Sequence, residues 1–141
     1  MPREGDALFV VNDRLNVALS CAADGVHLGQ YDIPIQQARQ LCPHDFIIGA
    51  SVRCAAKAVR AEHEGADYAA VSPVFPTSTK HDGRVACGVA EITLIRKAVE
   101  IPVIAIGGIG LNTVREVLEA GADEVAVISV VVAQPDIRLQ P

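Results

Sequence analysis

Three hydroxyl side chains stand between a proline and a lysine in the segment PVFPTSTK (73–80), directly after the apolar run YAAVS (68–72). The hydroxyls belong to Thr77, Ser78 and Thr79. Hydroxyl and backbone N–H groups donate hydrogen bonds to phosphate oxygens, and Lys80 adds a mobile positive charge that suits the same ligand. The spacing predicts a phosphate site just beyond a buried strand; an ordinary solvated loop is the alternative interpretation.

A pair of glycines predicts a second phosphate site. Gly107 and Gly108 end another apolar run and precede a helix expected to begin near Leu111. Glycine lets a ligand approach the backbone closely, and the free N–H groups at the start of a helix attract an anion. A tight turn that serves only the fold is the alternative interpretation of this pair.

Two aspartates, Asp13 and Asp32, lie just beyond two successive apolar runs. Carboxylates at neighbouring strand ends suit Mg²⁺, which takes few protein oxygens and completes its shell with phosphate oxygens and water. Each aspartate has an alternative role as a helix N-cap, because Asp13 precedes a helix expected near Arg14 and Asp32 precedes Ile33-Pro34. The sequence alone leaves both interpretations open.

The polar residues gather at one end of every predicted strand. Those ends carry Asn12 with Asp13, Gln30 with Asp32, Ser51, Ser72, Gly107 with Gly108, and Ser129. The opposite ends carry mainly turn residues. Ligands of α/β folds bind beyond the carboxyl ends of the strands, so this distribution predicts one shared site. Ser51 and Ser129 have an alternative role as N-caps, and we interpret His27 as a core or partly buried histidine.

The predicted elements form a repeating β/α pattern. Strands are expected at 7–11, 25–29, 46–50, 68–72, 103–107 and 125–129, and the helices between them include 34–41, 53–64, 90–99 and 111–120. The apolar runs are continuous, as in strands buried on both faces. The related stretches AADGVHL (22–28), GADYAAV (65–71) and GADEVAV (121–127) indicate repeated β/α units. We expect six parallel strands and five helices.

Composition sets limits on the class of protein. The 141 residues suffice for a single domain, 1–141, and half of them are hydrophobic. The net charge of −5 and the absence of a basic run argue against nucleic-acid binding. No apolar run approaches the ~20 residues needed to span a bilayer, and MPREGD is no signal peptide, so we expect no membrane association and a cytoplasmic location. The four scattered cysteines are expected to be reduced.

Several motifs together resemble the thiamine-phosphate synthase (thiamine-phosphate pyrophosphorylase) family. They are LFVVNDR (8–14), GVHLGQYD (25–32), IIGAS (47–51), PVFPTSTK (73–80), AIGGI (105–109) and GADEVAVIS (121–129). The resemblance runs in order from about Gly5 to Val131. It implies a parallel TIM-type (β/α)8 barrel. It also implies the Mg²⁺-dependent coupling of hydroxymethylpyrimidine diphosphate with thiazole phosphate, giving thiamine phosphate and pyrophosphate.

The resemblance also assigns roles. Asn12 and Lys80 would hold the diphosphate, Asp13 and Asp32 would bind Mg²⁺, and Ser51 would contact the pyrimidine. The thiazole phosphate would be held by Thr77, Ser78, Thr79, Gly108, Ile128 and Ser129. Lys80, Asn12 and Ser51 are the residues expected to act in catalysis. No protein nucleophile is required, and no Ser or Cys has a recognisable base beside it in these motifs.

The chain departs from the family pattern at both ends. The family begins with two further β/α units that carry a Gln-x-Arg-x-Lys run gripping the diphosphate, and nothing here matches that run. Arg14 and Arg84 are the nearest spare cations. The short stretch 133–141 contains two prolines, so no closing helix is expected. We therefore expect an incomplete barrel of about six strands and five helices, whose open edges favour self-association.

Two other functions fit the same sequence. One is an isomerase like the related thiazole tautomerases, which use a histidine as acid and base. The other is a non-catalytic remnant that binds a phosphorylated metabolite. The combined presence of Asn12, Asp13, Asp32 and Lys80 favours the synthase, while the sequence leaves the activity of this 141-residue chain open.

Overall fold

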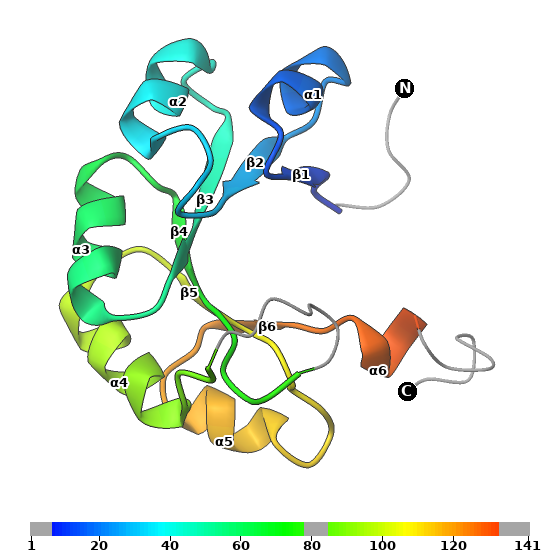
Figure 1. Ribbon diagram of the computed structural model, residues 1–141, viewed down its shortest axis with the longest axis vertical. Helices are drawn as coiled ribbons and strands as arrows, with labels where there is room; N and C mark the ends of the chain where they lie inside the picture. The colour runs from blue at the N-terminus through cyan, green and yellow to red at the C-terminus, as the bar shows by residue number, and fades with distance from the viewer. Residues whose placement is uncertain (1–6, 78–84, 133–141) are drawn as a thin grey trace.

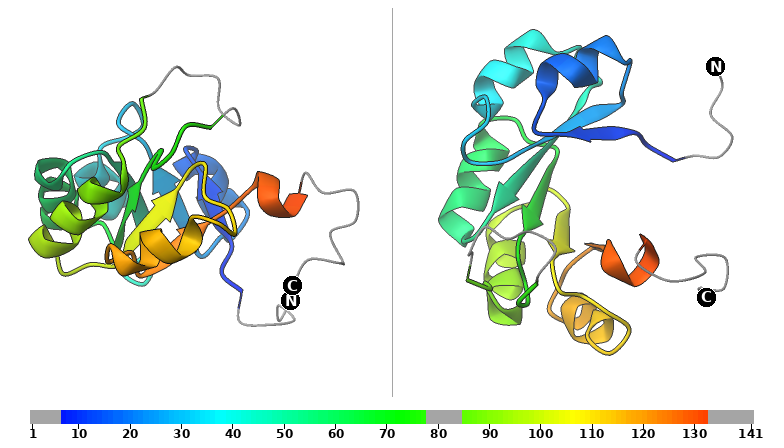
Figure 2. Two further views of the ribbon diagram at one scale, coloured as in Figure 1. Left: turned by 90° about the horizontal axis from the view of Figure 1, so that it is seen from below. Right: turned by 45° about the vertical axis from the view of Figure 1, so that its right-hand side comes forward.

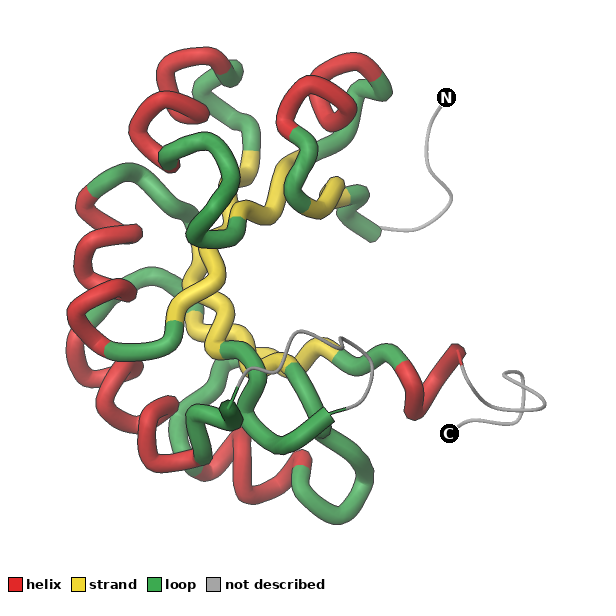
Figure 3. The backbone as a smooth tube through the Cα atoms, in the orientation of Figure 1, coloured by secondary structure: helices red, strands yellow, loops and turns green. Residues whose placement is uncertain are grey.

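The fold is half of a β/α barrel, seen in a computed structural model that describes residues 7–77 and 85–132 (Figure 1). Six parallel strands pair in chain order. They are β1 (Val10–Asn12), β2 (Gly25–Leu28), β3 (Ile47–Val52), β4 (Tyr68–Val71), β5 (Val103–Ile106) and β6 (Glu124–Ala126). The sheet curls so that the helices lie outside the strands, which confirms the predicted parallel, TIM-type architecture (Figure 3).

The helices lie between the strands, and one follows the last strand. They are α1 (Leu15–Ser20), α2 (Ile35–Leu41), α3 (Ala55–His63), α4 (Val89–Ala98), α5 (Val114–Glu119) and α6 (Ser129–Val132). As predicted, α2 ends just before Pro43, whose ring cannot continue a helix. The prediction of five helices is wrong for the described residues, because α6 adds a short turn of helix beyond β6 (Figure 2).

The last strand is shorter than predicted. The expected strand 125–129 is replaced by β6, whose three residues pair with Ile104–Ile106 of β5. Beyond Ile106 the chain turns at Gly107, where φ is +99°, so β5 offers no further partner. The segment after Ala126 therefore leaves the sheet, and Ser129 becomes the first residue of α6.

The outer face of the sheet forms the core. Val26, Ile48, Ala69 and Val71 are fully buried beneath the helices. Small residues of α3, such as Ala58, bring that helix close to the strands. Side chains alternate between the two faces of a strand, so the next residues along each strand face the inner, concave side. There the side chains have partial access to solvent, as at His27 and Tyr68.

The repeated turn motif has a structural role. In each copy the aspartate accepts a hydrogen bond from a backbone N–H at the start of the preceding strand. The three pairs are Phe9 N–H to Asp24 at 2.6 Å, Ile48 N–H to Asp67 at 2.7 Å, and Val103 N–H to Asp123 at 2.8 Å. Each hydrogen bond ties one β/α unit to the next, which confirms that the sequence repeat marks a structural unit.

Two of these turns also bind an arginine from the helix of the preceding β/α unit, α2 for the turn after α3 and α4 for the turn after α5. Arg39 pairs with Asp67, and Arg96 pairs with Asp123 at 2.8 Å. The aliphatic part of Arg39 lies against Gly65, and φ at that glycine is +98°, a value that favours a residue without a Cβ atom. The repeat thus fixes helix end, turn and strand start together.

Among the described residues, none of the helices has the length and apolar character required to cross a bilayer. The same residues contain no disulfide, in agreement with the prediction of reduced cysteines.

Candidate functional site

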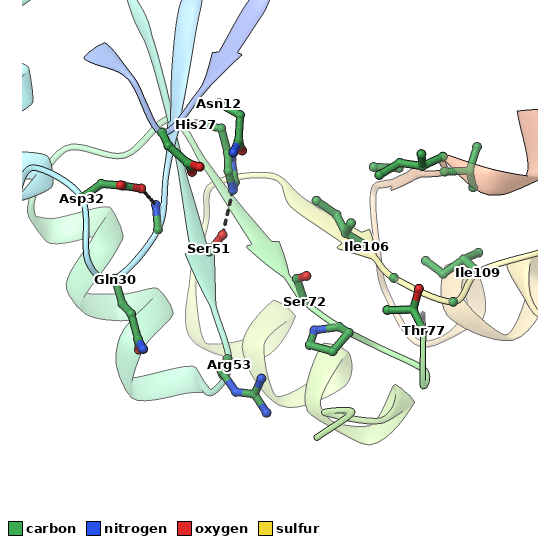
Figure 4. A pocket seen from close by; sticks show the side chains of 18 of the residues that line it. Asn12, His27, Gln30, Asp32, Ser51, Arg53, Ser72, Thr77, Ile106 and Ile109 are labelled. Atoms are coloured by element: carbon green, nitrogen blue, oxygen red, sulfur yellow. Dashed lines mark hydrogen bonds between the residues drawn. The ribbon is translucent and has the colours of Figure 1, made fainter. Parts of the chain in front are cut away.

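A cavity of about 740 Å³ opens at the carboxyl ends of the strands (Figure 4). Its lining includes eight of the residues proposed from the sequence: Asn12, Asp13, Asp32, Ser51, Thr77, Gly108, Ile128 and Ser129. Ser78, Thr79 and Lys80 lie outside the described residues. The carboxyl ends of the strands thus bring candidates from across the chain to one cavity, while their individual roles in binding stay predictions.

Asp13 occupies an unusual backbone conformation at the end of β1. Its φ is +66°, in the left-handed region that non-glycine residues seldom adopt and that Asp tolerates better than most. Its N–H donates a 2.8 Å hydrogen bond to the carbonyl oxygen of His27 on β2. The alternative role of Asp13 as a helix cap is wrong, because Arg14 occupies the N-cap position of α1 and no side chain caps that helix.

Asp32 closes the turn after β2. One carboxylate oxygen, Oδ2, accepts a 2.6 Å hydrogen bond from the N–H of Gly29. Pro34 occupies the N-cap position of α2, so the cap interpretation is wrong for Asp32 as well. The turn holds the carboxylate at the cavity wall, and among the described residues no hydrogen bond to its other oxygen, Oδ1, is found.

The donor set fits Mg²⁺ better than a softer metal. Asp13 and Asp32 offer carboxylate oxygens and Asn12 offers an amide oxygen at the same cavity. In the described part of the chain, no group of three or more His, Cys, Asp or Glu side chains is arranged to hold a metal ion. Two carboxylates completed by water and substrate oxygens are the usual environment of Mg²⁺ at phosphate sites.

Ser51 lies in β3 and is hydrogen-bonded to a histidine. Its Oγ is 2.8 Å from Nε2 of His27, and Nδ1 of the same ring is 3.0 Å from the hydroxyl of Tyr68. The sequence motifs did not reveal this neighbour, because His27 and Ser51 belong to different strands. The N-cap interpretation of Ser51 is wrong, since Cys54 occupies that position of α3. Burial raises the pKa of Tyr68, so its hydroxyl keeps its proton.

The glycine pair accommodates the close approach of a neighbouring loop. A Cβ atom on Gly108 would lie 2.7 Å from Cβ of Phe75 and 2.7 Å from the carbonyl oxygen of Pro76. The close approach is thus made by the neighbouring loop. Helix α5 begins at Val114 rather than near Leu111, which overturns the expected helix start directly after the glycines. Gly108 still lines the cavity.

Two cations at the cavity escaped the sequence reasoning. Arg53 and Lys57 both line it, and Nζ of Lys57 donates a 3.0 Å hydrogen bond to Oε1 of Gln30. Nη2 of Arg53 donates to the carbonyl oxygen of Val85 at 2.5 Å, while its buried Nη1 has no partner among the described residues. Arg53 could have been found from its position in the sequence, because it follows Ser51 by two residues at the same strand end.

The sequence suggested two spare cations, of which the structure describes one. Arg14 is absent from the described lining of this cavity, and Arg84 lies outside the described residues.

The curled parallel sheet, its outer helices and the cavity at the strand ends define an open fold of the TIM-barrel type. The sequence profile described as thiamine monophosphate synthase matches residues 1–131. The chain belongs to this family.

Curated relatives and a solved structure agree with that assignment. The chain is 55% identical to the thiamine-phosphate synthase of Methanoregula boonei, over 96% of this chain and 62% of the relative. It is 50% identical to the thiamine-phosphate synthase of Pyrococcus furiosus, over 98% of this chain and 66% of the relative. The solved thiamine phosphate pyrophosphorylase from Pyrococcus furiosus superposes with a TM-score of 0.85 at 49% identity, covering 94% of this chain and 63% of that one.

A more distant solved structure shows the fold alone. FabK from Thermotoga maritima superposes with a TM-score of 0.69 at 24% identity. The chain spans 62% to 66% of the length of the two curated relatives described above.

Proposed function

We propose that the chain carries an active site of thiamine-phosphate synthase type. The reaction joins hydroxymethylpyrimidine diphosphate to thiazole phosphate, giving thiamine phosphate and pyrophosphate. The observation that supports it is the single cavity at the strand ends, which is lined by two aspartates, an asparagine and a serine from β1, β2 and β3 and the turns that follow them. These residue types match the demands of diphosphate departure and of pyrimidine binding.

Asp13 and Asp32 are the proposed ligands of Mg²⁺. The ion, when bound, supplies positive charge that stabilises the departing diphosphate. Asn12 orients the diphosphate through its amide. Lys80, which lies outside the described residues, is the proposed second source of positive charge. Because charge develops on the leaving group, donors fixed in place before the reaction lower its barrier.

The second substrate is proposed to bind on the opposite wall of the cavity. Thr77, Gly108, Ile128 and Ser129 line that wall, and Ser78 and Thr79 complete the proposed set from outside the described residues. Ser51 contacts the pyrimidine. Holding two substrates in contact removes much of the entropic cost of their encounter, and the apolar side chains of Ile106 and Ile109 help to exclude water from the reacting atoms.

The proposal predicts Mg²⁺-dependent turnover that is lost in Asp32→Asn. Asn keeps an oxygen that accepts the Gly29 N–H, so the turn persists while the charge is removed. We expect turnover to fall by at least about a hundredfold with little change in the thermal unfolding midpoint. Pyrophosphate release measures the activity, and the exposed Asp45→Asn is the matched control. Unchanged turnover in Asp32→Asn would contradict the metal assignment.

An isomerase similar to thiazole tautomerases is a second candidate, because His27 lies in the cavity, where an acid–base histidine is needed. The two candidates differ in their need for metal. Conversion of a thiazole phosphate tautomer without Mg²⁺ or pyrimidine diphosphate would support the isomerase and contradict the synthase.

We also propose that the chain associates with a second copy of itself. The strands β1 and β6 form the two edges of the described sheet, and an edge strand presents unpaired N–H and C=O groups to any other strand. Apolar side chains near both edges add to this tendency, including Phe9, which is 45% exposed, and Val132, which is 67% exposed.

A further inference from the structure

Three residues form one row across the inner face of the sheet. His27 on β2 pairs with Gly49 on β3, and Gly49 pairs with Tyr68 on β4. Because Gly49 has no side chain, the ring of Tyr68 lies across β3. A Cβ atom on Gly49 would be only 1.9 Å from Cζ and 2.2 Å from the hydroxyl oxygen of that ring. The glycine therefore lets Tyr68 reach a strand with which its own strand does not pair.

The ring of Tyr68 contacts the ring of His27. The two rings stack with their centroids 5.6 Å apart and their planes inclined by 23°. The tyrosine hydroxyl is 3.0 Å from Nδ1 of His27. Nε2 of the same ring is 2.8 Å from Oγ of Ser51 (Figure 4). A continuous chain of hydrogen bonds, called the relay below, thus runs from Tyr68 through His27 to Ser51, the proposed pyrimidine contact.

The direction of this chain follows from the tyrosine. Burial keeps the phenol protonated, and within the described residues its hydroxyl has no hydrogen-bond partner other than His27. The side chain is partly withdrawn from solvent, and a phenol is a stronger hydrogen-bond donor than acceptor, so the hydroxyl donates to Nδ1. A neutral imidazole that accepts at Nδ1 carries its hydrogen on Nε2 and donates there. Ser51 therefore accepts from His27 and keeps its own hydrogen for the cavity.

We propose that Tyr68 and His27 are positioning residues that hold Ser51 as a hydrogen-bond donor toward a ring nitrogen of the heteroaromatic substrate. This inference rests on the proposed function for the identity of that substrate. A ring nitrogen of a pyrimidine accepts a hydrogen bond, whereas an exocyclic amino group donates one. The opposite direction would leave Ser51 as an acceptor and would select the amino group instead.

The first test reads the position of the hydrogen on His27 by ¹⁵N NMR of the ligand-free chain at mildly alkaline pH. The four histidines are distinguished by comparison with His27→Gln. We expect the Nε2–H tautomer in the unmodified chain and a mixture of tautomers in Tyr68→Phe, which keeps the ring and removes the hydroxyl. A dominant Nδ1–H tautomer, or an unchanged spectrum in Tyr68→Phe, would overturn the proposal.

The second test couples the relay to ligand binding. With hydroxymethylpyrimidine diphosphate and Mg²⁺ as the probe, Tyr68→Phe should weaken binding about two- to tenfold, as expected for one hydrogen bond. In a Ser51→Ala background the same change should have no further effect, because the group that the relay orients is gone. An equal loss in both backgrounds would show that Tyr68 acts through the fold alone and would overturn the proposal.

The two tests also separate this inference from the proposed function. Failure of the unmodified chain to bind the pyrimidine diphosphate would count against the proposed function. The tautomer of His27 is measured without any ligand, so it decides the direction of the hydrogen bonds in either case.

Discussion

Gly49 shows how a missing side chain organises the site. The space that its Cβ atom would take is filled by the ring of Tyr68, and that ring supports His27 and, through it, Ser51. No polar group of Gly49 takes part in this arrangement. The site therefore depends on a residue that offers no chemistry of its own.

For this single residue we predict that Gly49→Ala lowers the free energy of unfolding by about 1–3 kcal/mol, the usual cost of overpacking. The added methyl group displaces Tyr68 from its place over β3. Urea unfolding measures the change, and Gly110→Ala is the matched control, because its Cβ atom would meet nothing closer than 3.9 Å. Equal losses in both variants would show that the ring is not the cause.

Asp13 illustrates a conflict between stability and function. The left-handed conformation at φ +66° strains a residue with a side chain, while glycine adopts it without cost. We predict that Asp13→Gly leaves the free energy of unfolding unchanged or raises it by up to about 1 kcal/mol, since relief of strain is offset by the greater freedom of glycine in the unfolded chain. Mg²⁺-dependent turnover should fall at least about a hundredfold. A clear loss of stability would indicate a structural role for the carboxylate.

At the scale of the elements, the repeated aspartates hold successive units together. The hydrogen bond from the Val103 N–H is the main cause that lowers the pKa of Asp123, and Arg96 adds to it while burial opposes it. A carboxylate whose pKa is lowered by folding stabilises the fold above its unfolded value of about 3.9. That contribution is lost as the pH falls through the folded pKa.

We therefore predict that Asp123→Asn lowers the free energy of unfolding at neutral pH and that the difference disappears in strong acid. Asn still accepts the Val103 N–H, so the comparison isolates the charge. The side chain is 47% exposed, so solvent screening limits the effect to about 1 kcal/mol or less. Urea unfolding across the pH range measures it, with the exposed Glu119→Gln as control. A difference that persists in acid would contradict the electrostatic origin.

The sequence predicted the elements well where local patterns determine them. Helix α2 ends before Pro43, and the turn at Gly121 precedes β6, because proline and glycine act on their own backbone. The end of β6 was missed because a strand continues only as far as its partner, and β5 stops at Ile106. That limit lies in another segment of the chain and leaves no mark in the apolar run itself.

The same distinction applies to the site: residues marked by their position after a strand were predicted, and contacts between strands were not. Asn12, Asp13 and Asp32 follow their strands directly, so position alone indicated them. The relay from Tyr68 to Ser51 depends on the register of three strands, which brings together residues 24 and 41 positions apart in the chain. Neither separation has a local signature, and only the assembled sheet reveals it.

For the whole molecule, the open edges are the feature with the largest consequence. The described sheet is curled but not closed, so β1 and β6 do not pair with each other (Figure 1). A sheet edge with exposed apolar neighbours such as Leu8, which is 65% exposed, is a template for another strand.

We predict concentration-dependent self-association, seen as a rise in mass by sedimentation or light scattering as the chain is concentrated. Val10→Pro should weaken it. The N–H of Asp13 bonds to His27 on β2, and N–H groups alternate in direction along a strand, so the N–H of Val10 faces the open edge and proline removes it. The control is Val59→Lys, which changes an exposed residue of helix α3. A monomer at every concentration would contradict the prediction.

Each strand of the sheet pairs only with the strands that precede and follow it in the chain. In the sheet, each β/α unit is therefore stabilised directly by its neighbours alone, much as in solenoid proteins, where each repeat contacts only the adjacent repeats. Damage to one unit weakens the adjoining units first and reaches distant ones only through those between. The two ends of the sheet can loosen independently of each other, and the units at its centre, which carry Ser51 and Tyr68, are the last to open.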